Sequence, residues 1–236
     1  MSTPAPSHSM SQNMALIRLL QLASPTLPIG AYSYSQGLEA AIEKGLVKDE
    51  ASAQKFISAH LRQAIAYFEA PVFWRLMRAF AARDTMQVLE WSDCFIASRD
   101  SAEFRAETIQ MGYSLGKLIT DLQLPDAGLL ALLQAPTELP LPTALACAAV
   151  ALEISAPAAL LGMLFSWAEN QVLVCVKSVP LGQVAGQRIL LALGPELEAT
   201  AQLAQRLEDE ELCNWWPGLS LLSMQHEVQF TRLYRS

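Results

Sequence analysis

Charged side chains are scarce in this sequence of 236 residues, because Asp, Glu, Lys and Arg together supply only 17% of it. An average soluble domain contains about 25%. Hydrophobic residues make up 52% and the formal net charge is −7, which excludes a disordered chain and a protein that coats nucleic acid. The chain is long enough to bury a large core, and its shortage of charge predicts that part of its surface is covered in a complex.

Cysteine and histidine are also rare, with four and three copies. The two closest cysteines are 28 residues apart, so no pair has the spacing of a zinc site or a redox-active disulfide. We interpret all four as reduced, packed side chains of a cytoplasmic protein. His60 lies one position from a helical core row, which favours a surface or packing role, and no metal site is predicted.

Motifs of catalysis are missing as well. The sequence has no GxxxxGK[ST] or GxGxxG loop, no HExxH metal motif and no GxSxG nucleophile elbow. These absences predict a protein that is not an enzyme and carries no cofactor. The acidic balance and the lack of a basic amphipathic helix argue against nucleic acid and membranes as partners.

No hydrophobic run reaches the length of a membrane span. The most apolar stretch, residues 154–168, has 15 residues and contains Pro157, whereas a span needs about 20 residues. We expect a buried helix there. Residues 1–13 contain no Lys or Arg and no apolar run of the kind found in export signals, and they are expected to form a flexible tail.

Apolar residues recur at helical spacing through most of the chain, and no alternating segment indicates a strand. The sequence therefore predicts an all-α fold, a single-domain bundle of about nine or ten helices over residues 14–224. Asp49 is expected to begin one of these helices as an N-cap. The clearest pattern follows Ser101 and consists of Phe104, Thr108, Met111, Leu115, Leu118 and Leu122.

Prolines and glycines divide the bundle. Pro71 is expected to kink or split the helix that starts at Asp49, and Gly194-Pro195 is expected to end another. A further helix is expected over residues 196–211, with a frayed acidic end. Gly112 and Gly116 offer a smooth strip that another helix could approach closely.

Two groups of polar residues are hard to assign from the sequence alone. Glu169, Asn170 and Gln171 interrupt an apolar helix, and their burial would require hydrogen-bond partners. His226 and Glu227 form either a polar helix face or a pair in which each side chain meets its own partner. One alternative function is a small-ligand or cofactor-binding protein that uses the apolar region 143–177 as its pocket, although no histidine lies there to serve as a haem ligand.

Three separated blocks, residues 21–39, 164–183 and 226–236, resemble the urease accessory protein UreF family. The first contains Leu27-Pro28-Ile29-Gly30-Ala31-Tyr32-Ser33-Tyr34-Ser35-Gln36-Gly37-Leu38-Glu39, which matches the family's N-terminal signature almost residue for residue. The region around Arg99, Glu103, Arg105, Glu107 and Met111-Gly112 is similar to its middle helix. Gln225 and Asp100 depart from the pattern, where Arg and Glu are usual.

The resemblance implies an all-α, non-enzymatic scaffold that forms a homodimer. It also implies two protein partners, the UreD/UreH accessory protein and the GTPase UreG, in a complex that delivers nickel to apo-urease in a GTP-dependent way. On this basis the partner-binding residues are expected in three groups. They are Tyr32, Gly37 and Glu39 in an N-terminal recognition helix, Lys177 and Arg99 in contacts with the GTPase or along the dimer core, and His226, Glu227, Arg232 and Tyr234 in contact with UreD/UreH.

The C-terminal residues 225–236 are expected to form a partner-binding tail that becomes ordered on docking. Chain ends usually make few core contacts. Deletion of this tail is therefore expected to leave the helical fold intact and to weaken the contact with UreD/UreH.

Overall fold

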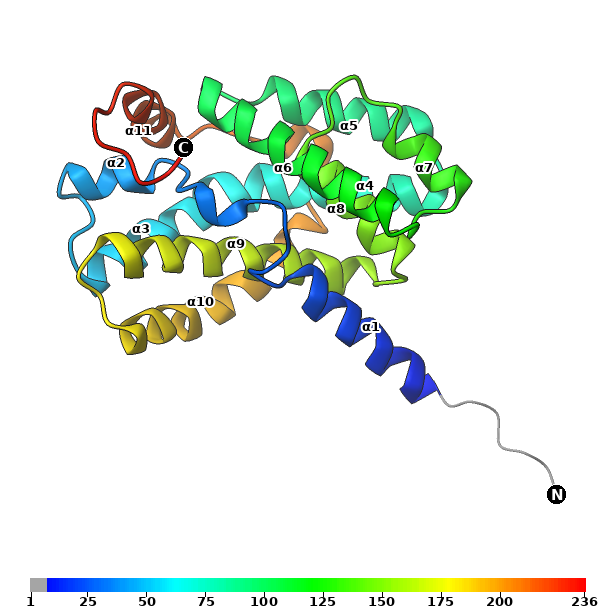
Figure 1. The fold of residues 1–236 in the computed structure, drawn as a ribbon, viewed down its shortest axis with the longest axis horizontal. Coiled ribbons are helices and arrows are strands. Elements are labelled where there is room, and N and C mark those ends of the chain that lie inside the picture. Colours follow the sequence, from blue (N-terminus) through cyan, green and yellow to red (C-terminus); the bar gives the residue numbers. More distant parts are fainter. Residues whose placement is uncertain (1–7) are drawn as a thin grey trace.

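The computed structural model describes residues 8–236, and the regular elements of this part of the chain are all helices, with no strand (Figure 1). The all-α prediction is confirmed. The elements are α1 (His8–Leu22), η1 (Ala31–Ser33), α2 (Leu38–Glu43), α3 (Glu50–His60), η2 (Leu61–Glu69), α4 (Ala70–Ala82), α5 (Thr85–Ala97), α6 (Ala102–Asp121), α7 (Ala127–Leu133), α8 (Leu141–Ala151), α9 (Ala156–Ser178), α10 (Gln183–Ala204), η3 (Asp209–Glu211) and α11 (Pro217–Glu227).

Helix starts follow the capping residues of the sequence. Asp49 and Ser101 accept hydrogen bonds from the backbone N–H groups of Ser52 and Phe104, as expected of N-caps. The first helix differs from the expectation, because α1 begins at His8 and not at Met14. Residues 1–7 of the expected N-terminal tail lie outside the described residues.

Pro71 does not end the helix, because α3, η2 and α4 follow one another without a loop. Pro71 lies in the first turn of α4, where a missing N–H is tolerated, and the nine residues before α4 form a π-helix. The carbonyl oxygen of Tyr67, four residues before Pro71, accepts a hydrogen bond from the Cys213 N–H at 3.0 Å. The proline therefore changes the helical register without ending the rod.

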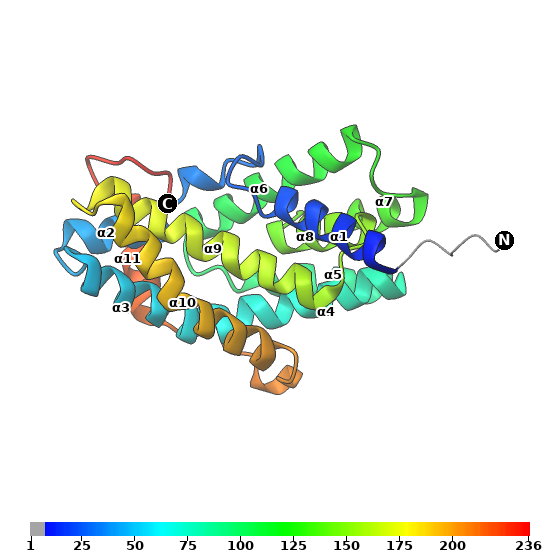
Figure 2. The same cartoon turned by 90° about the horizontal axis from the view of Figure 1, so that it is seen from below.

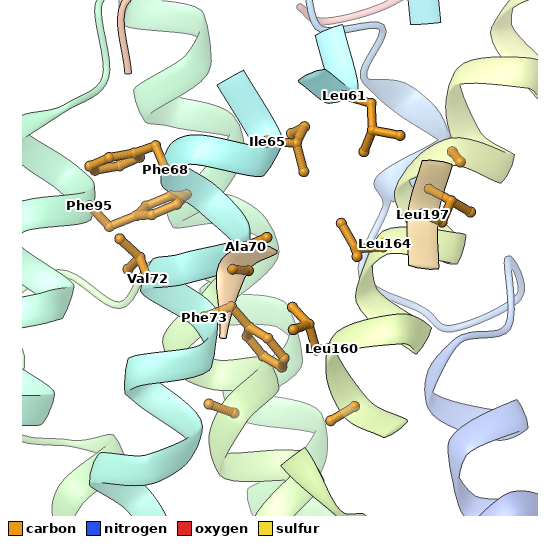
Figure 3. Packing of buried hydrophobic residues seen from close by; sticks show 14 of the residues in the cluster. Leu61, Ile65, Phe68, Ala70, Val72, Phe73, Phe95, Leu160, Leu164 and Leu197 are labelled. Atoms are coloured by element: carbon orange, nitrogen blue, oxygen red, sulfur yellow. The ribbon is translucent and has the colours of Figure 1, made fainter. Parts of the chain in front are cut away.

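The core lies around this rod. Figure 3 shows Phe68 stacked on Phe95, with ring centres 6.1 Å apart, and Phe73 pointing toward Leu160 of α9. Burial of these side chains supplies most of the driving force for folding, at about 1.5–3 kcal/mol for each large apolar residue.

Helix α9 runs through the middle of the bundle, with α10 along one side of it (Figures 1 and 2). It is long and apolar enough to cross a membrane by length and composition alone. Here it packs against α10, α4, α2, α3 and α1, and its side chains Ala159, Leu160, Leu164 and Ala168 are buried. This agrees with the expected buried helix at 154–168.

Helix α10 contradicts two expectations. It continues through Pro195, which was expected to end a helix, and it stops at Ala204, before the acidic residues 209–211. Gly194 has no Cβ to clash with the proline ring, and buried side chains continue on both sides of the proline, from Ile189 to Leu197. Their packing outweighs the one backbone hydrogen bond that Pro195 cannot donate.

Gly112 and Gly116 of α6 contact the connector between α7 and α8, residues 134–140, at a place where a helix was expected. A Cβ atom at Gly112 would lie 2.0 Å from the carbonyl oxygen of Leu139, and one at Gly116 would lie 2.7 Å from the Leu139 side chain. The connector leads directly into α8, which then packs along α6. The two glycines therefore allow the backbone before α8 to touch α6.

Candidate partner-binding site

The C-terminal segment folds back onto the N-terminal part of the chain. The N–H of Ser35 donates to the carbonyl oxygen of Ser236 at 2.7 Å, and the N–H of Arg235 donates to that of Ser33 at 2.8 Å. Figure 1 shows the segment returning from α11 across α2. Two of the three blocks noted in the sequence, 21–39 and 226–236, are therefore neighbours in space.

Glu39 is the residue that fastens this segment. Its Oε1 accepts a hydrogen bond from the Leu233 N–H at 2.7 Å, and its Oε2 accepts one from the Tyr234 N–H at 3.0 Å. The same Oε2 lies 2.9 Å from Nε2 of His226. The carboxylate, which is largely buried, thus ties α2 to both α11 and the chain that follows it.

His226 lies between two carboxylates and is completely buried. Its Nδ1 lies 2.8 Å from Oε2 of Glu103, and Arg232 donates to the other oxygen of Glu103 at 2.8 Å. Each ring nitrogen of His226 therefore has a carboxylate oxygen as its hydrogen-bond partner. We call Glu39, Glu103, His226 and Arg232 the tail clamp.

Gly37 makes room for this arrangement. It is the N-cap of α2 and has a left-handed φ of 78°, which favours glycine. A Cβ atom there would lie 3.3 Å from Leu219 and 3.4 Å from Leu222 of α11. The glycine therefore serves both the turn into α2 and the close packing of α11.

Glu107 is a site residue that the sequence analysis did not select. It is completely buried, where it accepts hydrogen bonds from Gln36 and from the hydroxyl of Ser236, both at 2.7 Å. Burial raises the pKa of this carboxyl to about 7. Its position was a usable signal, because it falls three residues after Phe104 and four before Met111, on the buried face of α6.

The third block, 164–183, also reaches this region. Asn170 donates to the carbonyl oxygen of Tyr34 at 3.0 Å, and the Trp167 indole donates to Gln36 at 2.8 Å. Gln171 is completely buried and its amide reaches Gln36 at 3.4 Å. The expected hydrogen-bonded network at Asn170 and Gln171 is therefore present, although Oε1 of Gln171 has no partner among the described residues.

The remaining expected contact residues are dispersed. Tyr32 and Lys177 are exposed, at η1 and in the last turn of α9. Glu227 accepts a hydrogen bond from the Ala102 N–H at the start of α6. Arg99 is buried among the core elements, where it pairs with Glu69 at 2.7 Å and lies over the Phe95 ring.

The two departures from the family pattern have different surroundings. Asp100 accepts a hydrogen bond from the Ser220 hydroxyl at 2.6 Å, so the shorter carboxylate still reaches α11. Gln225 is exposed on α11, beside the buried His226.

The C-terminal segment is not the unstructured tail expected from the sequence. His226, Tyr234 and Ser236 are all buried within the chain itself. The premise of the deletion experiment is therefore wrong, because removal of residues 225–236 would leave Glu39 and Glu103 without their buried partner. In this conformation Glu39 and His226 hold the segment and do not face outward.

The segment exposes three large apolar side chains beside the polar residues Thr231, Arg232 and Arg235. Val228, Phe230 and Leu233 point to solvent, and Phe230 is exposed over its whole surface. We call these three residues the tail patch. Exposed large apolar side chains that lie close together in the sequence are typical of protein–protein contact. Among residues 8–236, no group of three or more His, Cys, Asp or Glu side chains is placed to hold a metal ion.

Comparison with known proteins connects these features to one family. Residues 47–194 match the family described as UreF. The chain is 72% identical over 225 residues to the urease accessory protein UreF of Janthinobacterium sp. (strain Marseille), which covers 95% of this chain and 100% of the relative. It is 59% identical to the protein of the same name from Nitrosospira multiformis, over 96% of this chain and 100% of the relative.

Proposed function

Because the chain belongs to the UreF family of urease accessory proteins, we propose that it is a cytoplasmic scaffold without catalytic activity. In this proposal it forms a homodimer, joins the UreD/UreH protein to the GTPase UreG, and supports GTP-dependent insertion of nickel into apo-urease. Nickel is then cargo of the assembly and not a resident cofactor of this chain.

The tail patch is the observation that carries the proposal. Val228, Phe230 and Leu233 are exposed, while Glu39 binds the backbone N–H of Leu233 and Glu103 binds the side chain of Arg232. A surface that is already ordered loses little conformational entropy on binding. The tail patch is therefore the contact for UreD/UreH, and the tail clamp positions it.

A second apolar surface lies on the opposite part of the chain. Leu16, Ile17 and Leu20 of α1 are exposed, as are Leu161 and Phe165 of α9, and the two helices contact each other. Figure 1 shows α1 projecting from the bundle. A scaffold that holds more than one protein needs more than one such surface, and this one supplies area for its further contacts.

The individual residues then have two kinds of role. Exposed Tyr32 and Lys177 are placed for direct polar contact with a partner. Arg99, Gly37 and His226 act from inside, because they hold the helices on which the contact surfaces lie.

The alternative of a small-ligand protein built on residues 143–177 is favoured by one observation. Leu145, Met163 and Trp167 line an internal cavity. A cavity of this kind is compatible with a scaffold, so it describes an additional site and does not replace the proposed function.

Reconstitution tests the proposal directly. The purified chain is mixed with UreD/UreH and UreG in the presence of GTP and separated by size exclusion. The proposal predicts one complex that contains all three proteins. It is contradicted if the chain elutes alone with both partners present.

A matched pair of variants tests the tail patch. Leu233→Ser changes an exposed leucine in the patch, and Leu191→Ser changes one of similar exposure on α10. L233S is expected to weaken UreD/UreH binding at least about tenfold, the effect of losing 1.4 kcal/mol from a buried interface residue. L191S is expected to bind like the unmodified chain. Equal binding by both variants would reject the assignment of this surface.

A further inference from the structure

Glu107 is a buried carboxyl group that forms no ion pair within residues 8–236. Only 3% of its surface is exposed, and none of the ion pairs in this part of the chain includes it. Its hydrogen-bond donors are both neutral, the amide of Gln36 and the hydroxyl of Ser236, each at 2.7 Å. A glutamate is almost never fully buried unless it is paired with a cation. The position therefore suits the protonated, uncharged carboxyl.

The arginines near Glu107 are bonded to other groups. Arg99 pairs with Glu69 at 2.7 Å, and the two act on the pKa of Glu107 in opposite directions, because Glu69 raises it and Arg99 lowers it. Arg235 of the C-terminal segment donates to Gln110 of α6 at 3.4 Å. Neither arginine therefore serves as a counter-ion for an ionised Glu107.

The other charges on this side of α6 belong to the tail clamp. Glu103, one turn before Glu107, is bonded to His226 of α11 and to Arg232 of the C-terminal segment. Helix α8, which packs along α6, has no charged side chain. The clamp therefore uses its cations on its own carboxylates.

The remaining titratable groups near Glu107 also have other partners or carry no charge. The Tyr34 hydroxyl donates to Gln110, and Asp100, which lines the same pocket as Glu107, accepts from the Ser220 hydroxyl. His60 lines that pocket as well, and burial lowers its pKa to about 3, so it is neutral at higher pH. No group that faces Glu107 compensates its negative charge.

Protonation changes what Glu107 can do in this place. A protonated carboxyl can donate its O–H and still accept a hydrogen bond, whereas an ionised one only accepts. Burial raises the pKa of Glu107 to about 7 from its ordinary 4.5, although the hydrogen bonds from Ser236 and Gln36 lower it in part.

Ser236 connects this carboxyl to the C-terminal segment, residues 228–236. It is completely buried, and its main-chain oxygen is a further negative group that accepts from the N–H and the hydroxyl of Ser35. Movement of Ser236 away from α6 removes one of the two donors of Glu107 and opens the carboxyl to water. The attached and detached states of the segment therefore bind the proton of Glu107 with different affinity.

We propose that Glu107 and Ser236 form a proton-controlled latch for the C-terminal segment. With Glu107 protonated the segment is held against α6 and α2, and with Glu107 ionised it detaches more easily. The tail patch belongs to this segment, so the latch controls how firmly the patch is held. Its consequence for UreD/UreH binding rests on the proposed function, whereas the latch itself does not.

The direction of the pH effect follows from the two states. The pKa of Glu107 is about 7 with the segment attached and takes the ordinary value of 4.5 with the carboxyl in water. Attachment is therefore strongest below pH 4.5 and weakens by up to about tenfold per pH unit as pH rises toward 7. Above pH 7 it levels off, because both states are then ionised.

Amide hydrogen exchange in the isolated full-length chain measures the attachment. The N–H groups of Leu233 and Tyr234 donate to Glu39 while the segment is attached. Their protection factors, which correct for the intrinsic pH dependence of exchange, are compared between the unmodified chain and Glu107→Gln. The ratio of E107Q to the unmodified chain is expected to rise about 40-fold from pH 5 to 7, and by less than about twofold more by pH 8. A ratio that does not change with pH overturns the proposal.

Glu198→Gln is the matched control, because it removes one carboxylate from the exposed face of α10. Its protection factors at Leu233 and Tyr234 are expected to follow those of the unmodified chain at every pH. The same pH-dependent ratio in E198Q would show that the effect belongs to net charge and would overturn the latch.

Low concentrations of urea separate release of the segment from unfolding of the whole chain. Local release exposes little surface, so protection at Leu233 and Tyr234 should hardly change with urea below the unfolding transition. Protection at Leu164, in the core of α9, should fall steeply. If Leu233 and Tyr234 follow Leu164, Glu107 acts on the whole fold and the latch is rejected.

A second measurement needs no variant. The side-chain carboxyl carbon of Glu107 in the unmodified chain is followed by NMR as pH changes, and its midpoint is expected near 7. A midpoint near the ordinary 4.5 would exclude the latch. All these measurements are made without UreD/UreH, UreG or urease, so their failure would leave the scaffold function untouched.

Discussion

Nε2 of His226 lies 2.9 Å from Oε2 of Glu39, although 187 positions separate the two residues in the sequence. The contact joins the short helix after the N-terminal loop to the last helix of the chain. Since Glu39 also accepts the N–H groups of Leu233 and Tyr234, its carboxylate ties α2 to both α11 and the end of the chain.

Removal of His226 is expected to be strongly destabilising. His226→Ala removes a completely buried ring and takes one hydrogen-bond partner from each of the buried carboxylates Glu39 and Glu103, and a buried polar group left without its partner costs about 1–3 kcal/mol. The free energy of unfolding from urea denaturation measures the effect. Gln225→Ala, at the exposed neighbouring position, is the control and is expected to change stability by less than about 0.5 kcal/mol. A loss below about 1 kcal/mol in H226A would show that the clamp does not hold the segment.

Glu107 predicts a decrease in stability with rising pH. The folded carboxyl has a pKa of about 7 against an ordinary value of 4.5, so between these values the folded state binds more protons than the unfolded state. The free energy of unfolding therefore falls as pH rises through that window, by about 3 kcal/mol if Glu107 acts alone. Glu107→Gln keeps the shape of the protonated form and should remove this slope, making the variant more stable than the unmodified chain at pH 8. An unchanged slope in E107Q would exclude Glu107 as its source.

For His60 we expect the free energy of unfolding to change with pH in the opposite direction, over a lower pH range. Its folded pKa of about 3 lies below the ordinary 6.5, so its contribution is complete above pH 6.5 and is lost as pH falls toward 3. His60→Phe should remove this loss and leave only the falling slope of Glu107 above pH 4.5. Denaturation curves at pH 4, 5.5 and 8 distinguish the two variants. H60F and E107Q should change the pH dependence of the free energy of unfolding in opposite directions. Parallel pH profiles for the two would contradict both assignments.

The close approach of the connector to α6 predicts a severe effect from a single methyl group. Gly112→Ala would place a Cβ atom 2.0 Å from the Leu139 carbonyl oxygen, a contact that only a backbone shift can relieve. We expect a loss of at least about 2 kcal/mol in the free energy of unfolding. Gly218 lies in the first turn of α11, and a Cβ atom there would lie 3.8 Å from its nearest neighbour. Gly218→Ala should therefore be neutral or stabilising by up to about 1 kcal/mol. Equal stabilities of the two variants would show that α6 and the connector are not packed as described.

The sequence predicted those features that depend on local chemistry. Helical periodicity was sufficient for the fold class, and the predicted cap Asp49 begins α3. Pro195 was misread because a proline breaks a helix locally, whereas here the packing of Ile189 and Leu197 on neighbouring helices continues past it. Such tertiary packing is not visible in the spacing of residues along one helix.

The partner-binding roles assigned from the sequence stay predictions, and the geometry of the candidate site was not foreseen. Resemblance selected Glu39, His226 and Arg232, yet nothing in their spacing indicated that they contact one another inside the chain. Glu107 was missed as a site residue although its place on the apolar face of α6 was visible. The exposed Phe230 and Leu233 were passed over because exposure is a property of the folded chain.

The nickel content of urease from cells that express the whole urease gene cluster tests the scaffold function most directly. Four strains are compared, with the unmodified chain, without the chain, with Phe230→Ala in the tail patch, and with Met86→Ala on the exposed face of α5 as the control. We expect urease to lack nickel without the chain, to contain less of it with F230A, and to contain the normal amount with M86A. Normal nickel content in urease from cells without the chain would contradict the proposed function.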